Sequence, residues 1–177
     1  MEKKLKKRKK NLKRNLKRNL RRKIEGGLEK VDQTIKKIIK RTLEKSENLY
    51  TKEAADLIYE TGKAESGYIA LEQSGGGPAL GFFQCEPATL HDCIDNYIKY
   101  RPELQETLLS LGFLEDDPEF SLKTNIAVQV FFCRIKYRRD KEPIPKTKQD
   151  RAKYWKRVYN TEGGKGTVEH YLKANKW

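Results

Sequence analysis

The sequence predicts an all-α domain preceded by a basic amphipathic helix. Apolar residues recur at three- and four-residue spacings along most of the chain, and no convincing run of alternating strand residues interrupts them. The charge is unevenly distributed: residues 1–23 contain fourteen Lys and Arg and one acid, so they carry +13 of the net charge of +14. The length of 177 residues allows one domain with a core and an appendage. We therefore expect an N-terminal extension over 1–50 and a globular domain over 51–177.

The extension contains a repeat of period four, NLKRNLKRNLRR. Every fourth position is apolar (Leu12, Leu16, Leu20, Ile24 and Leu28), and the pattern resumes after Gly26-Gly27 at Val31, Ile35, Ile38 and Ile39. On a helix this spacing gives a slowly drifting apolar stripe beside a dense basic face. Two interpretations stay open. The helix adsorbs to an anionic membrane, to nucleic acid or to a partner such as a virion component, or it is a solvated helix whose leucines dock on its own domain.

The remaining helices follow from apolar spacing and from residues that start or break helices. We expect them over 28–48, 51–63, 87–100, 102–112, 121–138, 150–159 and 167–174. Thr51 is a suitable N-cap, and Pro87 suits a first helical turn. The segment 64–86, rich in glycine and aromatic residues, is expected to be irregular.

The cysteines and histidines do not predict a metal site. Three cysteines and two histidines occur with no recognised ligand spacing. Buried thiols in a reducing compartment are the favoured interpretation. A nucleophilic pair of Cys85 with His91 or His170 is the alternative, and no motif supports it. No apolar run approaches the roughly 20 residues of a membrane span, and no secretory signal pattern is present, so we expect synthesis in a cytoplasm without an export signal.

One irregular stretch brings a carboxylate close to aromatic residues. A helix ending at Glu65 would deliver this side chain to the edge of a cleft, and Phe82 and Phe83 would supply an apolar wall. A carboxyl desolvated in this way retains its proton to higher pH, as a general acid requires. Gln84 offers both a donor and an acceptor to a sugar or amide. The alternative is that Glu65 is a surface carboxylate and the phenylalanines belong to the core.

Four motifs in order resemble the soluble lytic transglycosylase and goose-type lysozyme superfamily. The first two lie in ESGYIALEQSGGGPALGFFQCEPAT, where Glu65-Ser66 matches the catalytic motif and Gly81-Phe82-Phe83-Gln84 with Pro87-Ala88-Thr89 matches the second. Asp117-Pro118 with Asn125-Ile126 is similar to the third, and Tyr159-Asn160 is similar to the fourth. The resemblance covers residues 51–174. The chain departs from the family pattern at Phe82-Phe83, where Leu-Met is usual, and at Thr161-Glu162, where Ala-Gly is usual.

The resemblance implies a lysozyme-like fold and cleavage of the β-1,4 bond between N-acetylmuramic acid and N-acetylglucosamine in peptidoglycan. Glu65 would act as acid and then base. The substrate-binding residues implied are Ser66, Phe82, Phe83, Gln84, Tyr159 and Asn160. Tyr159 would bond near the reacting sugar, and Ser66 and Gln84 would orient Glu65 or an N-acetyl group. The implied chemistry needs no metal or organic cofactor, and the implied partner is the peptidoglycan glycan strand.

Alternatives remain for the outcome and for the class of protein. With one matched acid, a lytic transglycosylase is favoured over a hydrolytic lysozyme, which normally uses a second carboxylate; Glu72, Glu86, Asp92 and Glu162 are the candidates for that role. A non-catalytic structural or nucleic-acid-binding virion protein is the alternative from another class. Because the substrate lies outside the cytoplasm and no export signal is seen, we expect a bacteriophage enzyme, either an endolysin or a virion protein.

Overall fold

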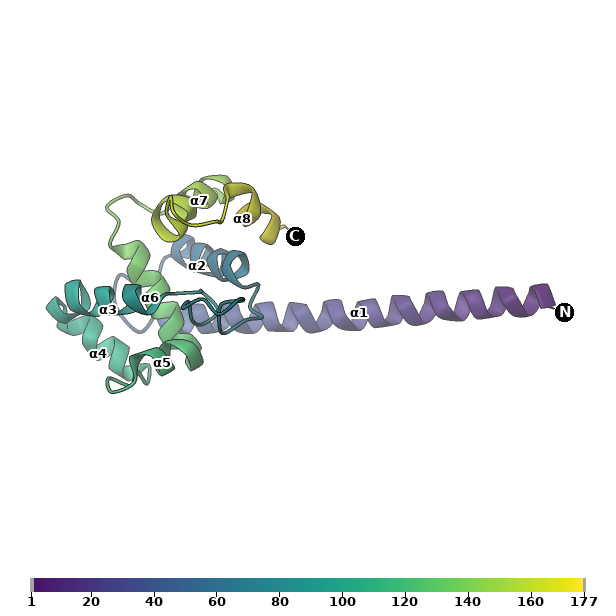
Figure 1. Ribbon diagram of the computed structural model, residues 1–177, viewed down its shortest axis with the longest axis horizontal. Coiled ribbons are helices and arrows are strands. Elements are labelled where there is room, and N and C mark those ends of the chain that lie inside the picture. The colour runs from purple at the N-terminus through teal and green to yellow at the C-terminus, as the bar shows by residue number, and fades with distance from the viewer. Residues whose placement is uncertain (1, 177) are drawn as a thin grey trace. The chain divides into compact units, whose positions relative to one another are not determined.

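The predicted all-α fold class is confirmed by the structure, a computed structural model that describes the backbone of residues 2–176 and the side chains of residues 14–176 (Figure 1). Within these residues the chain forms helices and no strands. The α-helices are α1 Glu2–Leu43, α2 Lys52–Glu65, α3 Pro87–Asn96, α4 Pro102–Ser110, α5 Pro118–Thr124, α6 Ile126–Arg138, α7 Lys148–Trp155 and α8 Val168–Ala174. A 3₁₀ turn, η1, spans Ile98–Tyr100, and a π-helical turn, η2, spans Lys156–Asn160.

The chain divides into two compact units, residues 1–37 and 38–177, whereas the sequence placed the boundary after residue 50. The second unit begins earlier because Ile39, Leu43 and Leu49 are buried in its core. In the first unit α1 continues through Gly26-Gly27 without a break. No helix in the described part of the chain combines the length and the apolar character that crossing a membrane would require.

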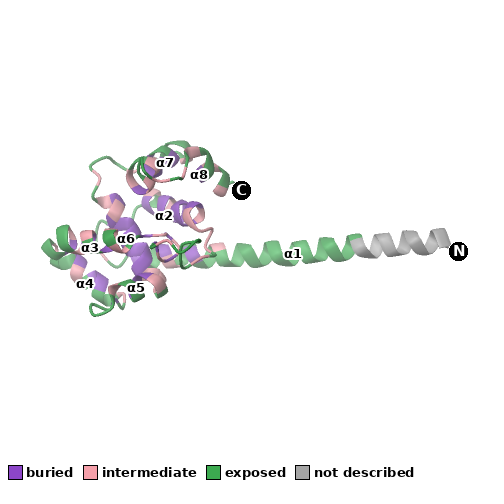
Figure 2. Ribbon diagram, in the orientation of Figure 1, coloured by how far each residue is buried: buried purple, intermediate pink, exposed green. Residues whose placement is uncertain are grey.

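Helix α6 is the centre of the second unit. Apart from its ends it is buried throughout, and it packs against α2, α3, α5 and η2 (Figure 2). The sequence predicted one helix over 121–138, but Asn125 divides it into α5 and α6. The Asn125 side chain accepts hydrogen bonds from the Ala127 and Val128 amides and donates to the Leu111 carbonyl. Asn125 thus caps α6 and holds the loop between α4 and α5, which explains the break between α5 and α6.

Two carboxylates in the C-terminal half of helix α2, Glu60 and Glu65, have different surroundings. Glu60 is buried and accepts two hydrogen bonds from the Arg151 guanidinium of α7, at 2.6 and 2.7 Å, and one from the Tyr171 hydroxyl of α8 at 2.8 Å. These bonds tie three helices together near the C-terminal half of α2. Glu65, the last residue of α2, lies little more than one turn beyond Glu60.

The irregular segment between α2 and α3 is held by a few backbone bonds. Leu80 and Cys85 exchange two hydrogen bonds, at 2.9 and 3.0 Å, and the Gly81 amide donates to the Leu71 carbonyl. Gly81 has φ of +70°, and a Cβ there would lie 2.8 Å from the Leu122 carbonyl oxygen. Both the left-handed backbone and the close approach to α5 therefore require glycine at this position.

Candidate active site

A cavity of about 800 Å³ opens beside the end of α2 in the second unit. Its lining comes from the end of α2, the segment before α3, the first turn of α3, the end of α6, and the region from α7 to α8. The residues that line it are Ala64, Glu65, Gln73, Ser74, Ala79, Gln84, Glu86, Thr89, Lys136, Trp155, Tyr159, Asn160, Thr161, Gly163, Gly164, Lys165, Gly166 and His170. Segments about a hundred residues apart in sequence therefore converge around Glu65.

The Glu65 carboxyl in this cavity has a strongly raised pKa. Burial raises the pKa of its carboxyl from 4.5 to about 7, although a hydrogen bond from Trp155 and the charges of Lys136 and His170 act in the opposite direction. The Trp155 indole N–H donates to Glu65 Oε1 at 2.9 Å. Desolvation disfavours the ionised form, so this carboxyl retains its proton close to neutral pH.

Four of the residues implied by the resemblance line this cavity: Glu65, Gln84, Tyr159 and Asn160. Gln84 has φ of +48°, an uncommon conformation for a residue with a side chain, and its Nε2 donates to the Gly81 carbonyl at 2.9 Å. Asn160 Oδ1 accepts from Lys156 Nζ at 2.9 Å. Both amide side chains are thus held in place by the protein at the cavity wall.

The other three predicted residues, Ser66, Phe82 and Phe83, are not among those lining the cavity. Phe83 is fully buried, and both phenylalanines pack edge-on against Tyr68. They form an aromatic cluster with Tyr68, so they do not form the apolar wall that was expected beside Glu65. The indole of Trp155 contacts the Glu65 carboxyl instead.

Ser66 and Tyr159 share a role that the sequence did not suggest. The Ser66 hydroxyl donates to the Phe82 carbonyl at 2.7 Å, and the Tyr159 hydroxyl donates to the Phe83 carbonyl at 2.8 Å. Gln129 of α6 adds a third bond, because its Oε1 accepts from the Phe82 amide at 2.9 Å. These contacts fix the backbone of the segment 81–84, and the Tyr159 hydroxyl, expected to face the reacting sugar, is committed to this bond.

Lys136, Trp155 and His170 also line the cavity. The sequence did not predict Lys136 or Trp155 as site residues, and it offered His170 only as the alternative partner of Cys85. Lys136 Nζ donates to the Tyr159 carbonyl at 2.7 Å and lies 4.1 Å from the centre of the Tyr159 ring. His170 Nε2 lies 2.7 Å from the Ala64 carbonyl oxygen; because that oxygen can only accept, Nε2 carries the proton. The one available clue was the four-residue spacing of Trp155 and Tyr159, which places both near one face of a helix.

Comparison of the chain with protein-family models, with curated proteins and with solved structures finds no match. The geometry of the second unit therefore carries the functional argument.

A lysine organises the loop that closes one side of the cavity. Lys156 Nζ donates to Asn160 Oδ1, to the Thr161 carbonyl and to the Gly164 carbonyl, at 2.8 to 2.9 Å. Thr161 has φ of +63°, which is rare for a β-branched residue and costs conformational energy. Residues of the π-helical turn and the strained Thr161 lie at the cavity, and both features are common at functional sites.

A second carboxylate lies at the same cavity. Within the described residues, Glu65 and Glu86 are the only carboxylates that line it. Of the other candidates, Glu72 forms an ion pair with Lys123, Asp92 with Arg139, and Glu162 is exposed outside the lining. Glu86 is therefore the one predicted candidate that lines the cavity together with Glu65.

The thiols are placed for packing and not for nucleophilic attack. Cys85, Cys93 and Cys133 are buried and unpaired, and burial raises the pKa of Cys85 to about 12. A thiol of such low acidity is a poor nucleophile at neutral pH. Among the side chains of residues 14–176, no three His, Cys, Asp or Glu groups lie close enough together to hold a metal ion.

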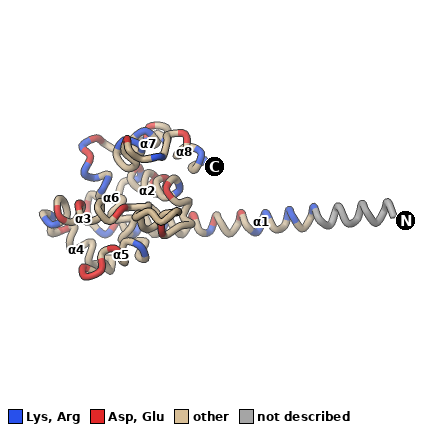
Figure 3. Tube along the Cα trace, in the orientation of Figure 1, with Lys and Arg blue, Asp and Glu red and all other residues tan. Residues whose placement is uncertain are grey.

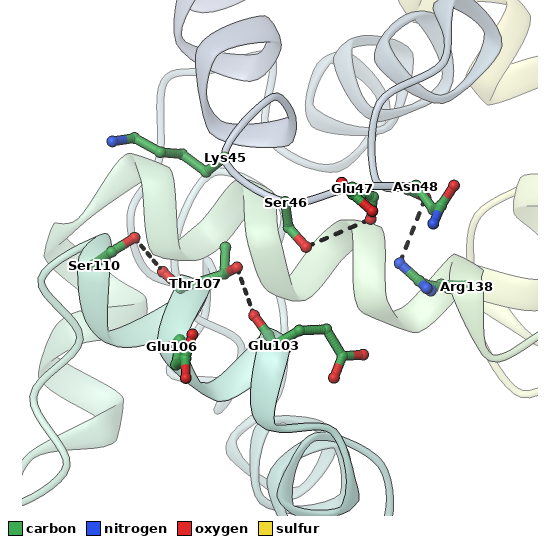
Figure 4. A pocket seen from close by; sticks show the side chains of 9 residues that line it. All are labelled: Lys45, Ser46, Glu47, Asn48, Glu103, Glu106, Thr107, Ser110 and Arg138. Carbon is green, nitrogen blue, oxygen red and sulfur yellow. Dashed lines mark hydrogen bonds between the residues drawn. The ribbon is translucent and has the colours of Figure 1, made fainter.

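A smaller cavity of about 450 Å³ lies between the turn after α1, α4 and α6 (Figure 4). Its lining is polar, with Glu103 and Glu106 from α4 and Arg138 from α6. Arg138 donates to the Asn48 carbonyl at 3.4 Å, and both glutamates are exposed. None of the predicted site residues lines this cavity, so the candidate active site is the one beside Glu65.

Proposed function

We propose that this protein cleaves the glycan strands of peptidoglycan, with Glu65 as general acid and then base. The observation that carries the proposal is the Glu65 carboxyl itself, whose pKa is raised to about 7 by burial beside a cavity of about 800 Å³. A general acid works best when its pKa lies near the working pH, because both protonation states are then accessible. The four motifs in the sequence supply the substrate class.

The proposed reaction begins with proton transfer from Glu65 to the glycosidic oxygen. The bond to the leaving sugar breaks, and positive charge develops at the anomeric carbon in an oxocarbenium-like transition state. The Glu65 carboxylate then accepts a proton from the attacking hydroxyl, which restores the acid. Lys136 and His170 stabilise this carboxylate, because both lower its pKa.

Trp155 positions Glu65 through this sequence of steps. Its indole N–H donates to Oε1 at 2.9 Å, which leaves the other carboxyl oxygen, Oε2, as the one to carry and transfer the proton. The donor is also an uncharged indole and not Lys or Arg, so the carboxyl is not neutralised in an ion pair with its bonded partner. This arrangement favours a catalytic role for Glu65 over the alternative of a non-catalytic virion protein.

The group that attacks the anomeric carbon distinguishes a lyase from a hydrolase. In a lytic transglycosylase the muramoyl 6-hydroxyl attacks and an anhydro ring forms, whereas a lysozyme uses water. The single matched acid favours the transglycosylase. Glu86 at the same cavity supports the lysozyme as the second candidate, since a second carboxylate can hold the water. Mass spectrometry of the products decides between them, because hydrolysis adds one water per cleaved bond and ring closure adds none.

The test of the function is cleavage of purified peptidoglycan by Glu65→Gln and by the matched variant Glu162→Gln. Both changes replace one carboxylate, but Glu162 is exposed and lies outside the cavity lining. We expect Glu65→Gln to lose at least 99% of the rate, about a hundredfold, since general acid catalysis contributes a factor of roughly 10²–10⁴. We expect Glu162→Gln to retain full activity. A Glu65→Gln protein that clears peptidoglycan at more than a few per cent of the normal rate would remove Glu65 from the mechanism.

A further inference from the structure

The described part of α1 carries an exposed apolar stripe. Five apolar residues are between 49 and 60% exposed: Leu16, Leu20, Ile24, Leu28 and Val31. Single exposed apolar residues are ordinary on protein surfaces, but five at helical spacing along one helix form a continuous feature. A surface of this kind is typical of a helix that binds a partner through its apolar side.

Basic side chains surround this stripe. Figure 3 shows Lys and Arg along the described part of α1, and Arg14, Lys17, Arg18 and Arg22 are all exposed. Acidic residues appear only further along, where Glu25 pairs with Arg21 at 2.8 Å. The partner must therefore offer negative charge as well as an apolar environment.

Two other occupants fit this surface less well. Nucleic acid would use the cations through its phosphates, but it would leave the apolar stripe in water. A second copy of the helix would bring two strongly basic segments together. The constant spacing of four from Leu16 to Leu28 also lacks the alternation of three and four that a coiled-coil seam requires.

We infer that residues 14–31 form a membrane-surface helix that lies in the headgroup region of an anionic lipid bilayer. In that position the apolar side chains enter the acyl boundary and the Lys and Arg side chains reach the lipid phosphates. Each basic residue near an anionic surface adds to the attraction, which falls off within a Debye length. The helix would hold the enzyme at a bilayer that carries negative charge.

Vesicle binding by the full chain tests this inference separately from glycan cleavage. The probes are vesicles of phosphatidylglycerol mixed with phosphatidylcholine, vesicles of phosphatidylcholine alone, and a DNA duplex. Binding to vesicles is measured by co-sedimentation and binding to DNA by mobility, each at low and high salt. The stripe variant combines Leu16→Gln, Leu20→Gln, Ile24→Gln and Leu28→Gln, because glutamine is a good helix former. The control combines Asn15→Gln and Asn19→Gln, two changes outside the stripe, and circular dichroism compares the helix content of all three proteins.

We expect the unaltered chain and the control to bind the anionic vesicles, and to bind phosphatidylcholine at least tenfold more weakly. The stripe variant should bind the anionic vesicles about a hundredfold more weakly, given the size of the apolar contribution of four such side chains, while its binding to DNA stays within about twofold. Stripe-variant binding equal to that of the control would overturn the inference. So would a chain that binds DNA but not anionic vesicles, which would assign the helix to nucleic acid. Glu65→Gln should bind vesicles normally, so loss of catalysis and loss of adsorption remain separate results.

Discussion

Replacing Glu65 by Gln should stabilise the protein at alkaline pH and have little effect at acidic pH. In the folded chain burial raises the pKa of Glu65 from its ordinary 4.5 to about 7. Below pH 4.5 the carboxyl is protonated in both the folded and the unfolded state, so its burial carries no charge penalty. As the pH rises from about 4.5 to about 7, the unfolded chain releases a proton that the folded chain retains, and the free energy of unfolding falls.

The size of the effect follows from the gap between the two pKa values. Each pKa unit corresponds to about 1.4 kcal/mol, so a shift from 4.5 to about 7 amounts to about 3 kcal/mol once the pH exceeds both values. Gln has nearly the shape of Glu and still accepts the Trp155 hydrogen bond, but it never carries the charge. The variant should therefore lack this loss of stability.

Urea unfolding near pH 4 and near pH 8.5 measures the difference, with Glu162→Gln as the matched control. We expect the stability of Glu65→Gln relative to the unaltered chain to increase by about 2 to 3 kcal/mol between the two pH values. Glu162 is exposed, so its replacement should leave the pH dependence unchanged. If Glu65→Gln shows the same pH dependence as the unaltered chain, the Glu65 carboxyl is not desolvated and the basis for its role as an acid is lost.

Two further substitutions examine the surroundings of this carboxyl. Lys136→Gln should move the alkaline limb of the pH profile of the cleavage rate to higher pH, because the charge of Lys136 lowers the pKa of Glu65. Lys165→Gln, at the same cavity, should leave this limb in place. Identical pH profiles for the two variants would contradict the assignment of the alkaline limb to Glu65. Tyr159→Phe removes the hydroxyl that donates to the Phe83 carbonyl at 2.8 Å and should lower the free energy of unfolding by about 1 kcal/mol, measured with urea, whereas an unchanged stability would mean that this bond does not hold the loop.

Local patterns predicted the helices and part of the site, since both depend on short-range chemistry. Apolar spacing located α2 and α6, and Thr51 caps α2 as expected by accepting from the Ala54 amide. The position of Glu65 at a helix end was predictable for the same reason. The break at Asn125 was missed because it depends on the side chain's bond to the Leu111 carbonyl, which lies 14 residues away in sequence.

The roles of individual side chains at the site depended on tertiary packing. Ser66, Phe82 and Phe83 were expected at the cavity because the resemblance implies them, but the turn at Gly67 and Tyr68, both with positive φ, directs the chain differently. Trp155 reaches Glu65 only because α7 packs on α2. Sequence spacing does not encode that contact, so the indole that bonds the carboxyl was not predictable from local pattern.

The same pair of helices holds one glutamate in an ion pair and the other with a raised pKa. Glu60 and Arg151 form a bidentate pair that joins α2 to α7, and Glu65 and Trp155, further along the same two helices, form the second contact. Removing one member of a buried ion pair costs about 3–5 kcal/mol because the other charge is left unpaired, so the Glu60–Arg151 pair strongly favours one register of the two helices. That register delivers Trp155 to Glu65. A desolvated carboxyl destabilises the fold above its pKa, and at this position the contact between α7 and α2 keeps the Trp155 indole against it.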